Sequence, residues 1–201
     1  MTKIKLCGLT RESDIFYANV LAPDYVGFVF AKHSRRYIPP ENAAVLQKKL
    51  NTSIIPVGVF VDETTQHIAS LMEQGIIQIA QLHGNEDELY IRHLRQLTEG
   101  KIIKAFRIQS KEDILAANAS TADYVLLDSG GGSGELFDHS LIRGINRNYF
   151  LAGGLTPQNV RAAVEKLHPF AVDASSSLET DGLKDKTKMT AFVRAVRERM
   201  D

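Results

Sequence analysis

Short apolar runs alternate along the whole chain with longer segments whose apolar positions recur every three or four residues. The short runs are rich in Ile, Val, Leu and Phe, which is typical of buried strands, whereas the longer segments have the period of amphipathic helices. Eight strands are predicted, at residues 4–7, 25–30, 54–60, 76–82, 102–106, 124–127, 149–151 and 170–172. The regular alternation indicates repeated βα units.

Helical patterns occupy most of the segments between these strands. The predicted helices are residues 12–20, 42–50, 65–73, 87–97, 157–167 and 190–199, with a weaker pattern at 111–119 and the weakest one after Asp138. Pro157 follows Thr156 and suits the first position of a helix behind its N-cap. Eight βα units favour an α/β protein with one domain over residues 1–201, a (βα)8 TIM barrel whose parallel sheet is closed. An open, doubly wound sheet is the alternative.

Composition and charge favour a small-molecule partner. The chain has 201 residues with 44% hydrophobic and 24% charged content, which is typical of a globular protein able to bury a core. Lys plus Arg and Asp plus Glu both total 24, so no global field attracts nucleic acid or an anionic membrane. The chain has no apolar run near bilayer length, and we expect a cytoplasmic protein without a targeting peptide.

A barrel fold directs attention to the carboxyl ends of the strands, where such proteins build their sites. Cys7, the only cysteine of the chain, ends the first predicted strand and precedes Gly8. A nearby positive charge can convert a thiol into a thiolate that acts as base or nucleophile. Most unpaired cysteines are instead small buried hydrophobic residues, and Cys7 taken alone favours that interpretation.

Asp128 ends the sixth predicted strand and precedes a glycine-rich stretch at residues 129–134. A carboxyl group at the end of an apolar strand, beneath a mobile loop, suits a general acid. The alternative is a cap or turn residue. The glycine stretch lacks the Gly-Lys-Ser/Thr ending of a nucleotide loop and does not open a helix as a dinucleotide fingerprint does, so we expect no nucleotide there.

Glycine and serine residues follow the last two predicted strands. Gly153 and Gly154 come after the seventh strand, and Ser175 and Ser176 come after the eighth. Barrel enzymes commonly hold phosphate between these two loops, where backbone N–H groups and a helix N-terminus donate to the anion. The alternative is a pair of ordinary surface turns.

A basic loop at residues 32–37 and a histidine after the fourth strand are further candidates. An arginine of this loop can clamp a planar carboxylate, and its charge would favour a Cys7 thiolate. His83 is placed at the rim of the barrel. The histidines form no His-Glu-x-x-His motif and no calcium loop is visible, so we expect no metal. A Gly-x-Ser-x-Gly elbow is also absent, which disfavours a serine hydrolase.

At these positions the chain resembles the phosphoribosylanthranilate isomerases of tryptophan biosynthesis, over nearly its full length. The resemblance is carried by Lys-Leu-Cys-Gly-Leu-Thr at 5–10, Gly-Phe-Val-Phe at 27–30, Ser-Arg-Arg at 34–36, Gly-Val-Phe-Val at 58–61, Gln-Leu-His-Gly at 81–84, Leu-Asp at 127–128, Gly-Gly-Ser-Gly at 131–134, Phe-Asp at 137–138, Ala-Gly-Gly-Leu at 152–155 and Val-Asp at 172–173.

The resemblance implies a cofactor-free Amadori rearrangement of N-(5-phosphoribosyl)anthranilate. By this analogy Asp128 is the general acid that opens the ribose ring, and Cys7 is the general base that removes the C2 proton. The remaining implied roles are the anthranilate carboxylate site at Arg36, substrate contacts at His83 and Asp173, and a phosphate site at Gly153, Gly154, Ser175 and Ser176. The implied partner is the phosphorylated sugar-anthranilate substrate, and the protein is expected to be a monomer or a homodimer.

Three positions depart from the family pattern. Ser177 stands where glycine is usual, Arg35 where proline or lysine is frequent, and Glu135 where lysine is common. These changes bear on the phosphate contact, on affinity and on the glycine-rich loop, but leave the acid and the base intact.

Three other functions compete with this interpretation. The related isomerase family of histidine synthesis resembles an enzyme that uses two aspartates for catalysis. In this chain Cys7, and no aspartate, stands at the end of the first strand, which argues against that family. Indole-forming synthases would supply catalytic lysines; we expect Lys5 to point away from Cys7 in an alternating strand, and Lys104 remains a candidate. A silent barrel that binds a phosphorylated ligand or a protein would be expected to have lost Cys7 or Asp128.

Overall fold

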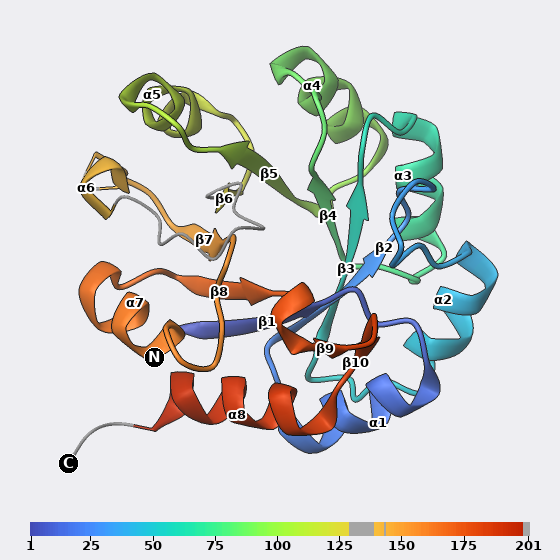
Figure 1. The fold of residues 1–201 in the computed structure, drawn as a ribbon. Coiled ribbons are helices and arrows are strands. Elements are labelled where there is room, and N and C mark those ends of the chain that lie inside the picture. Colours follow the sequence, from blue (N-terminus) through green and yellow to red (C-terminus); the bar gives the residue numbers. More distant parts are fainter. Residues whose placement is uncertain (129–138, 143, 199–201) are drawn as a thin grey trace.

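The chain folds into a closed barrel of eight parallel strands, here described from a computed structural model of residues 1–128, 139–142 and 144–198. Each strand pairs with the next along the chain, and β8 pairs with β1 to close the sheet (Figure 1). The strands are β1 (Lys3–Cys7), β2 (Tyr25–Val29), β3 (Ile55–Phe60), β4 (Ile79–Leu82), β5 (Lys101–Arg107), β6 (Tyr124–Asp128), β7 (Tyr149–Ala152) and β8 (Ala171–Ala174). The predicted closed parallel barrel is therefore confirmed.

Helices surround the barrel on its outside (Figure 1). They are α1 (Glu12–Leu21), α2 (Pro40–Gln47), α3 (Thr65–Glu73), α4 (Glu88–Leu97), α5 (Lys111–Ala119), α6 (His139–Ile142), α7 (Val160–Leu167) and α8 (Lys186–Arg197). Side chains cap several of them: Asp87 accepts from the Tyr90 N–H at the start of α4, and Asp185 accepts from the Thr187 and Lys188 N–H groups at the start of α8. No helix within the described part of the chain is long and apolar enough to cross a membrane.

Two local predictions are wrong. The helix expected to start at Pro157 starts at Val160, because Asn159 holds a turn: its side chain accepts from the Thr156 N–H and donates to the Gly154 carbonyl. The last helix begins at Lys186 rather than Thr190, and a short hairpin of β9 (Glu179–Thr180) and β10 (Leu183–Lys184) precedes it. The glycine-rich stretch at 129–134, with Glu135, lies outside the described residues.

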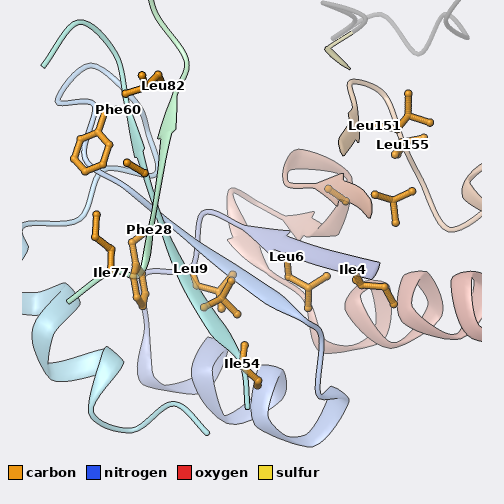
Figure 2. Packing of buried hydrophobic residues seen from close by; sticks show 14 of the residues in the cluster. Ile4, Leu6, Leu9, Phe28, Ile54, Phe60, Ile77, Leu82, Leu151 and Leu155 are labelled. Carbon is orange, nitrogen blue, oxygen red and sulfur yellow. The ribbon is translucent and has the colours of Figure 1, made fainter. Parts of the chain in front are cut away.

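Successive side chains of each strand alternate between the helices and the barrel interior. Ile4 and Leu6 project from one side of β1 into the apolar layer beneath the helices (Figure 2). Lys5 and Cys7 therefore share the opposite, inward side, since positions two apart on a strand face the same way. The expectation that Lys5 points away from Cys7 is wrong, and Lys5 is fully buried in the barrel.

Aromatic rings fill the end of the barrel at which the strands begin. Phe150 is fully buried there, with its ring centroid 5.3 Å from that of Tyr25 and 5.7 Å from that of Phe170. Tyr124 stacks on Phe170 at a centroid distance of 5.1 Å. This packing closes one end of the barrel and leaves the carboxyl ends of the strands to form a site.

We predict that Phe150→Ala destabilises the protein by about 3–5 kcal/mol, because it removes the ring at the centre of this cluster and leaves a cavity. The free energy of unfolding in urea measures the effect. Leu115→Ala is the matched control, since Leu115 is 67% exposed and its loss should change stability by no more than about 0.5 kcal/mol. Equal destabilisation by both substitutions would contradict the packing described for Phe150.

Candidate active site

A cavity of about 460 Å³ opens at the carboxyl ends of the strands. Its walls come from the ends of seven strands and the loops that follow β2, β3, β4, β7 and β8. The cavity is lined by all nine residues to which the resemblance assigns a role, namely Cys7, Arg36, His83, Asp128, Gly153, Gly154, Asp173, Ser175 and Ser176. Residues that are far apart in the sequence thus converge on one space.

A second cavity, of about 600 Å³, lies at the opposite end of the barrel. It is bounded by the start of β1 at Lys3, by Phe170 before β8 and by residues of α7 and α8. None of the predicted site residues lines it. We therefore place the chemistry in the smaller cavity.

The Cys7 thiol occupies space that Gly27 leaves open on the neighbouring strand. Cys7 and Gly27 are register partners in the β1–β2 pair, and a Cβ on Gly27 would lie 2.5 Å from Cys7 Sγ. Val29 and Val59 pack against the thiol. The sulfur is therefore held at the cavity wall in a largely apolar setting, with 7% of the residue exposed.

Buried charges beneath the thiol act on its acidity. Lys5 Nζ donates to Asp173 Oδ2 at 2.9 Å, which links β1 to β8 inside the barrel. Burial disfavours the charged form of Lys5, but Asp173 and Cys7 together outweigh this effect and raise the Lys5 pKa above its usual value. Burial raises the pKa of the Cys7 thiol, while the positive charges of Lys5 and Lys184 oppose that rise.

Asp128 belongs to a polar row that continues through His83 to Gln81. His83 Nε2 lies 3.5 Å from Asp128 Oδ2, and His83 Nδ1 lies 2.9 Å from Gln81 Nε2. If the Gln81 amide donates to Nδ1, the neutral ring carries its proton on Nε2 and directs it toward the Asp128 carboxylate. The row holds the His83 ring beside the candidate acid.

Three buried polar atoms at the cavity have no hydrogen-bond partner among the residues that the structure describes. They are Gln81 Oε1, Asp173 Oδ1 and Ser177 Oγ, and all three residues line the cavity. Buried polar groups are nearly always paired, so these atoms indicate that the cavity accommodates a polar ligand. Asp173 binds Lys5 through Oδ2, and its Oδ1 has no partner among the described residues.

The loops after β7 and β8 provide the candidate phosphate site. Gly153 and Gly154 have φ of 86° and 64°, in the left-handed region that favours glycine. The side-chain amide of Asn159 fixes this loop by donating to the Gly154 carbonyl at 2.9 Å. Ser175 Oγ donates to the Cys7 carbonyl at 3.0 Å, which ties the serine loop to the end of β1.

Arg36 reaches the cavity from the loop after β2, but its guanidinium is already engaged. Nε and Nη2 donate to Glu179 Oε1 and Oε2, at 2.6 and 2.8 Å. Lys184 Nζ donates to the same Glu179 Oε1 at 2.5 Å. Sequence reasoning missed both Glu179 and Lys184. The sequence signal for this hairpin was the dipeptide Asp181-Gly182, since Asp-Gly favours a two-residue hairpin turn. In the structure these residues have φ of 52° and 78°.

Lys104 does not line the cavity and instead anchors the loop after β4. Its Nζ donates to the Gly84 carbonyl at 2.7 Å and to Glu86 Oε2 at 2.9 Å. Glu86 in turn accepts from the backbone N–H groups of Asp62 and Gly84. Lys104 therefore supports the loop that carries His83. Within the described ranges, no group of three or more His, Cys, Asp or Glu is arranged to hold a metal ion.

Comparisons with known proteins agree on one family. The family model described as N-(5'phosphoribosyl)anthranilate (PRA) isomerase matches residues 4–195. The chain is 41% identical to the N-(5'-phosphoribosyl)anthranilate isomerase of Endomicrobium trichonymphae, over 98% of this chain and 99% of the relative. It is 42% identical to that of Clostridium kluyveri, over 98% of each chain.

Solved structures of such isomerases share the fold. The Thermotoga maritima enzyme superposes with a TM-score of 0.89 at 35% identity, covering 98% of this chain and 99% of that one. A further isomerase structure, in complex with reduced 1-(o-carboxyphenylamino)-1-deoxyribulose 5-phosphate, has a TM-score of 0.85 at 33% identity and covers 98% and 99% of the two chains.

We predict that Cys7 reacts slowly with iodoacetamide at neutral pH. Only the thiolate reacts, and a raised pKa lowers the thiolate fraction at any given pH. The midpoint of the alkylation rate against pH should lie above that of the same protein in urea, where Cys7, the sole cysteine, is solvated. Circular dichroism at each pH monitors folding. A midpoint below that of the unfolded chain would contradict the dominance of burial.

Proposed function

The chain belongs to the N-(5'-phosphoribosyl)anthranilate isomerase family, and from this premise we propose that Cys7 and Asp128 carry the proton transfers of its reaction. Members of the family are enzymes of tryptophan biosynthesis. The observation that carries the proposal is the convergence of Cys7 on β1 and Asp128 on β6 at one cavity, since these strands are not neighbours in the barrel.

Asp128 acts first, as general acid. It donates its proton to the furanose ring oxygen of N-(5-phosphoribosyl)anthranilate, and the bond between this oxygen and C1 breaks. The nitrogen lone pair forms a double bond to C1, which gives a protonated imine and a C4 hydroxyl. His83, 3.5 Å from Asp128 Oδ2, holds the carboxyl group in place during this step.

Cys7 then acts as general base. Its thiolate removes the proton from C2, the electrons of the C2–H bond form a C1–C2 double bond, and the π pair of the C=N bond moves onto the nitrogen. The resulting enolamine loses the C2 hydroxyl proton and gains one at C1, which yields 1-(2-carboxyphenylamino)-1-deoxyribulose 5-phosphate. C1 is reduced and C2 is oxidised within one molecule, so the reaction needs no external redox partner and, in this proposal, no cofactor.

The positively charged Lys5 supports the second step. It occupies the inward side of β1 together with Cys7, and its charge favours the thiolate over the thiol. Asp173 compensates the lysine charge when Cys7 is protonated. A buried cation that serves both groups keeps the thiol from becoming inert in its apolar surroundings.

The ends of the substrate bind at opposite sets of loops in this proposal. Arg36 binds the anthranilate carboxylate, while Gly153, Gly154, Ser175 and Ser176 surround the phosphate. The unpaired oxygens of Gln81 and Asp173 accept hydrogen bonds from the hydroxyl or N–H groups between these ends. The complex of a related isomerase with a reduced product analogue supports a ligand of this kind.

Contacts among the described residues argue against the two competing enzymes. Lys5 and Lys104, the lysines considered for an indole-forming synthase, are both ion-paired with buried carboxylates. Asp173 lines the cavity with Asp128, as a two-aspartate isomerase would require, but it is bound to Lys5 and Cys7 stands at the first strand end. We place the enzyme in the cytoplasm as a monomer or a homodimer; the Thermotoga maritima relative is described as dimeric.

We predict that Asp128→Asn and Cys7→Ala each lower kcat by about 10²–10⁴-fold, because each removes one proton-transfer group. Loss of the anthranilate-type fluorescence of freshly prepared substrate measures turnover. Affinity for a reduced product analogue should stay largely intact in Asp128→Asn. Asp181→Asn makes the same chemical change at an exposed turn and should keep wild-type kcat. Equal turnover rates for the wild type and Cys7→Ala would refute the role of Cys7. A loss of affinity with preserved turnover in Asp128→Asn would refute the role of Asp128.

A further inference from the structure

We propose that Glu179 is a positioning residue that orients Arg36, so that the free edge of the Arg36 guanidinium selects substrates with an aromatic carboxylate. This inference rests on the proposed role of Arg36 and deepens it. It assigns a task to the β9–β10 hairpin, which the proposed mechanism otherwise leaves unused.

The two oxygens of Glu179 occupy one edge of the Arg36 guanidinium. Nε donates to Oε1 and Nη2 donates to Oε2, so the two groups form a bidentate pair. Among the described residues, Glu179 is the only acceptor of Arg36 side-chain donors. A guanidinium has five N–H donors, and this pair uses two of them. The Nη1–Nη2 edge therefore remains for a second carboxylate in the same plane.

The stem of Arg36 is confined from below by the end of β1. A Cβ placed on Gly8 would lie 2.5 Å from Arg36 Cδ, so the arginine stem occupies the space that this glycine leaves open. Gly8 has φ of 80°, a left-handed conformation that favours glycine. The stem thus passes over Gly8, next to Cys7, and Glu179 fixes the direction in which the guanidinium points.

Glu179 is itself held in place by its own hairpin. Lys184 Nζ bridges Glu179 Oε1 and the Ser175 carbonyl, at 2.5 and 3.0 Å, and Lys188 Nζ donates to the Glu179 carbonyl at 2.5 Å. Burial opposes ionisation of Glu179, but the hydrogen bonds from Arg36 and Lys184 outweigh it and lower the Glu179 pKa. The carboxylate is therefore charged at neutral pH.

The charges of this cluster leave one positive charge at the rim of the cavity. Arg36 and Lys184 are cations and Glu179 is one anion, so the three side chains sum to a single positive charge. Their exposed fractions are small, at 22% for the Arg36 side chain, 1% for Lys184 and 9% for Glu179. Charges with little solvent around them require partners, and one substrate carboxylate balances this cluster.

Glu179→Gln tests the inference, because it keeps the size of the side chain and removes its charge and one acceptor oxygen. Two substrates are compared, phosphoribosylanthranilate and N-(5-phosphoribosyl)aniline, which lacks the carboxylate. We expect Glu179→Gln to raise KM for the first about tenfold with kcat within about twofold of wild type. KM for the second should stay unchanged. Asp181→Asn, in the same hairpin, is the matched control and should affect neither substrate.

Arg36→Met separates this inference from the proposed function. If Arg36→Met abolishes the preference for the carboxylate and Glu179→Gln does not, the role of Glu179 is refuted while that of Arg36 stands. If Arg36→Met leaves the preference intact, the proposed carboxylate site itself is refuted. An equal rise in KM for both substrates in Glu179→Gln would indicate a merely structural role and overturn the inference. Should Glu179→Gln not fold, Glu179→Asp replaces it. We then expect a smaller rise in KM, restricted to the substrate that has the carboxylate.

Discussion

Closure of the sheet between β8 and β1 is the constraint on which the candidate site depends. Lys5 and Asp173 are register partners across this seam, and their buried ion pair joins the two strands inside the barrel. Closure also brings the carboxyl ends of strands distant in sequence to one opening, so that Cys7, Asp128 and the glycines after β7 share a cavity. An open sheet would keep the first and last strands apart.

The thiol at this seam is under opposing influences. Burial favours its neutral form, whereas proton abstraction requires the thiolate, and the nearby lysines shift the balance toward the charged form. Burial of ionised groups is costly unless they are paired, and Lys5 is paired with Asp173 while Lys184 is paired with Glu179. The charge of Asp173 partly opposes the influence of Lys5 on the sulfur, and Lys184 shares Glu179 with Arg36.

The sequence was sufficient to predict the barrel and the residues at its strand ends, because local periodicity determines the strands and barrel geometry determines where their ends meet. The orientation of Lys5 also follows from the sequence, because residues two apart on a strand face the same way and Lys5 is two residues from Cys7. The expectation that Lys5 points away from Cys7 contradicts this period. The pairing of Glu179 with Arg36 was not predictable, because it joins loops far apart in the sequence through a hairpin of two-residue strands. Asn159 likewise displaced the start of α7 through side-chain hydrogen bonds that no periodicity reveals.

The aromatic cluster at the other end of the barrel separates stability from chemistry. Phe150, Tyr25 and Phe170 lie among the starts of the strands, whereas the residues with a proposed role in the reaction lie at the ends. Substitutions around the cavity therefore leave this aromatic packing untouched. Because of this division, the loops at the carboxyl ends can acquire substitutions that change the ligand, while the aromatic cluster at the other end maintains the barrel that holds these loops.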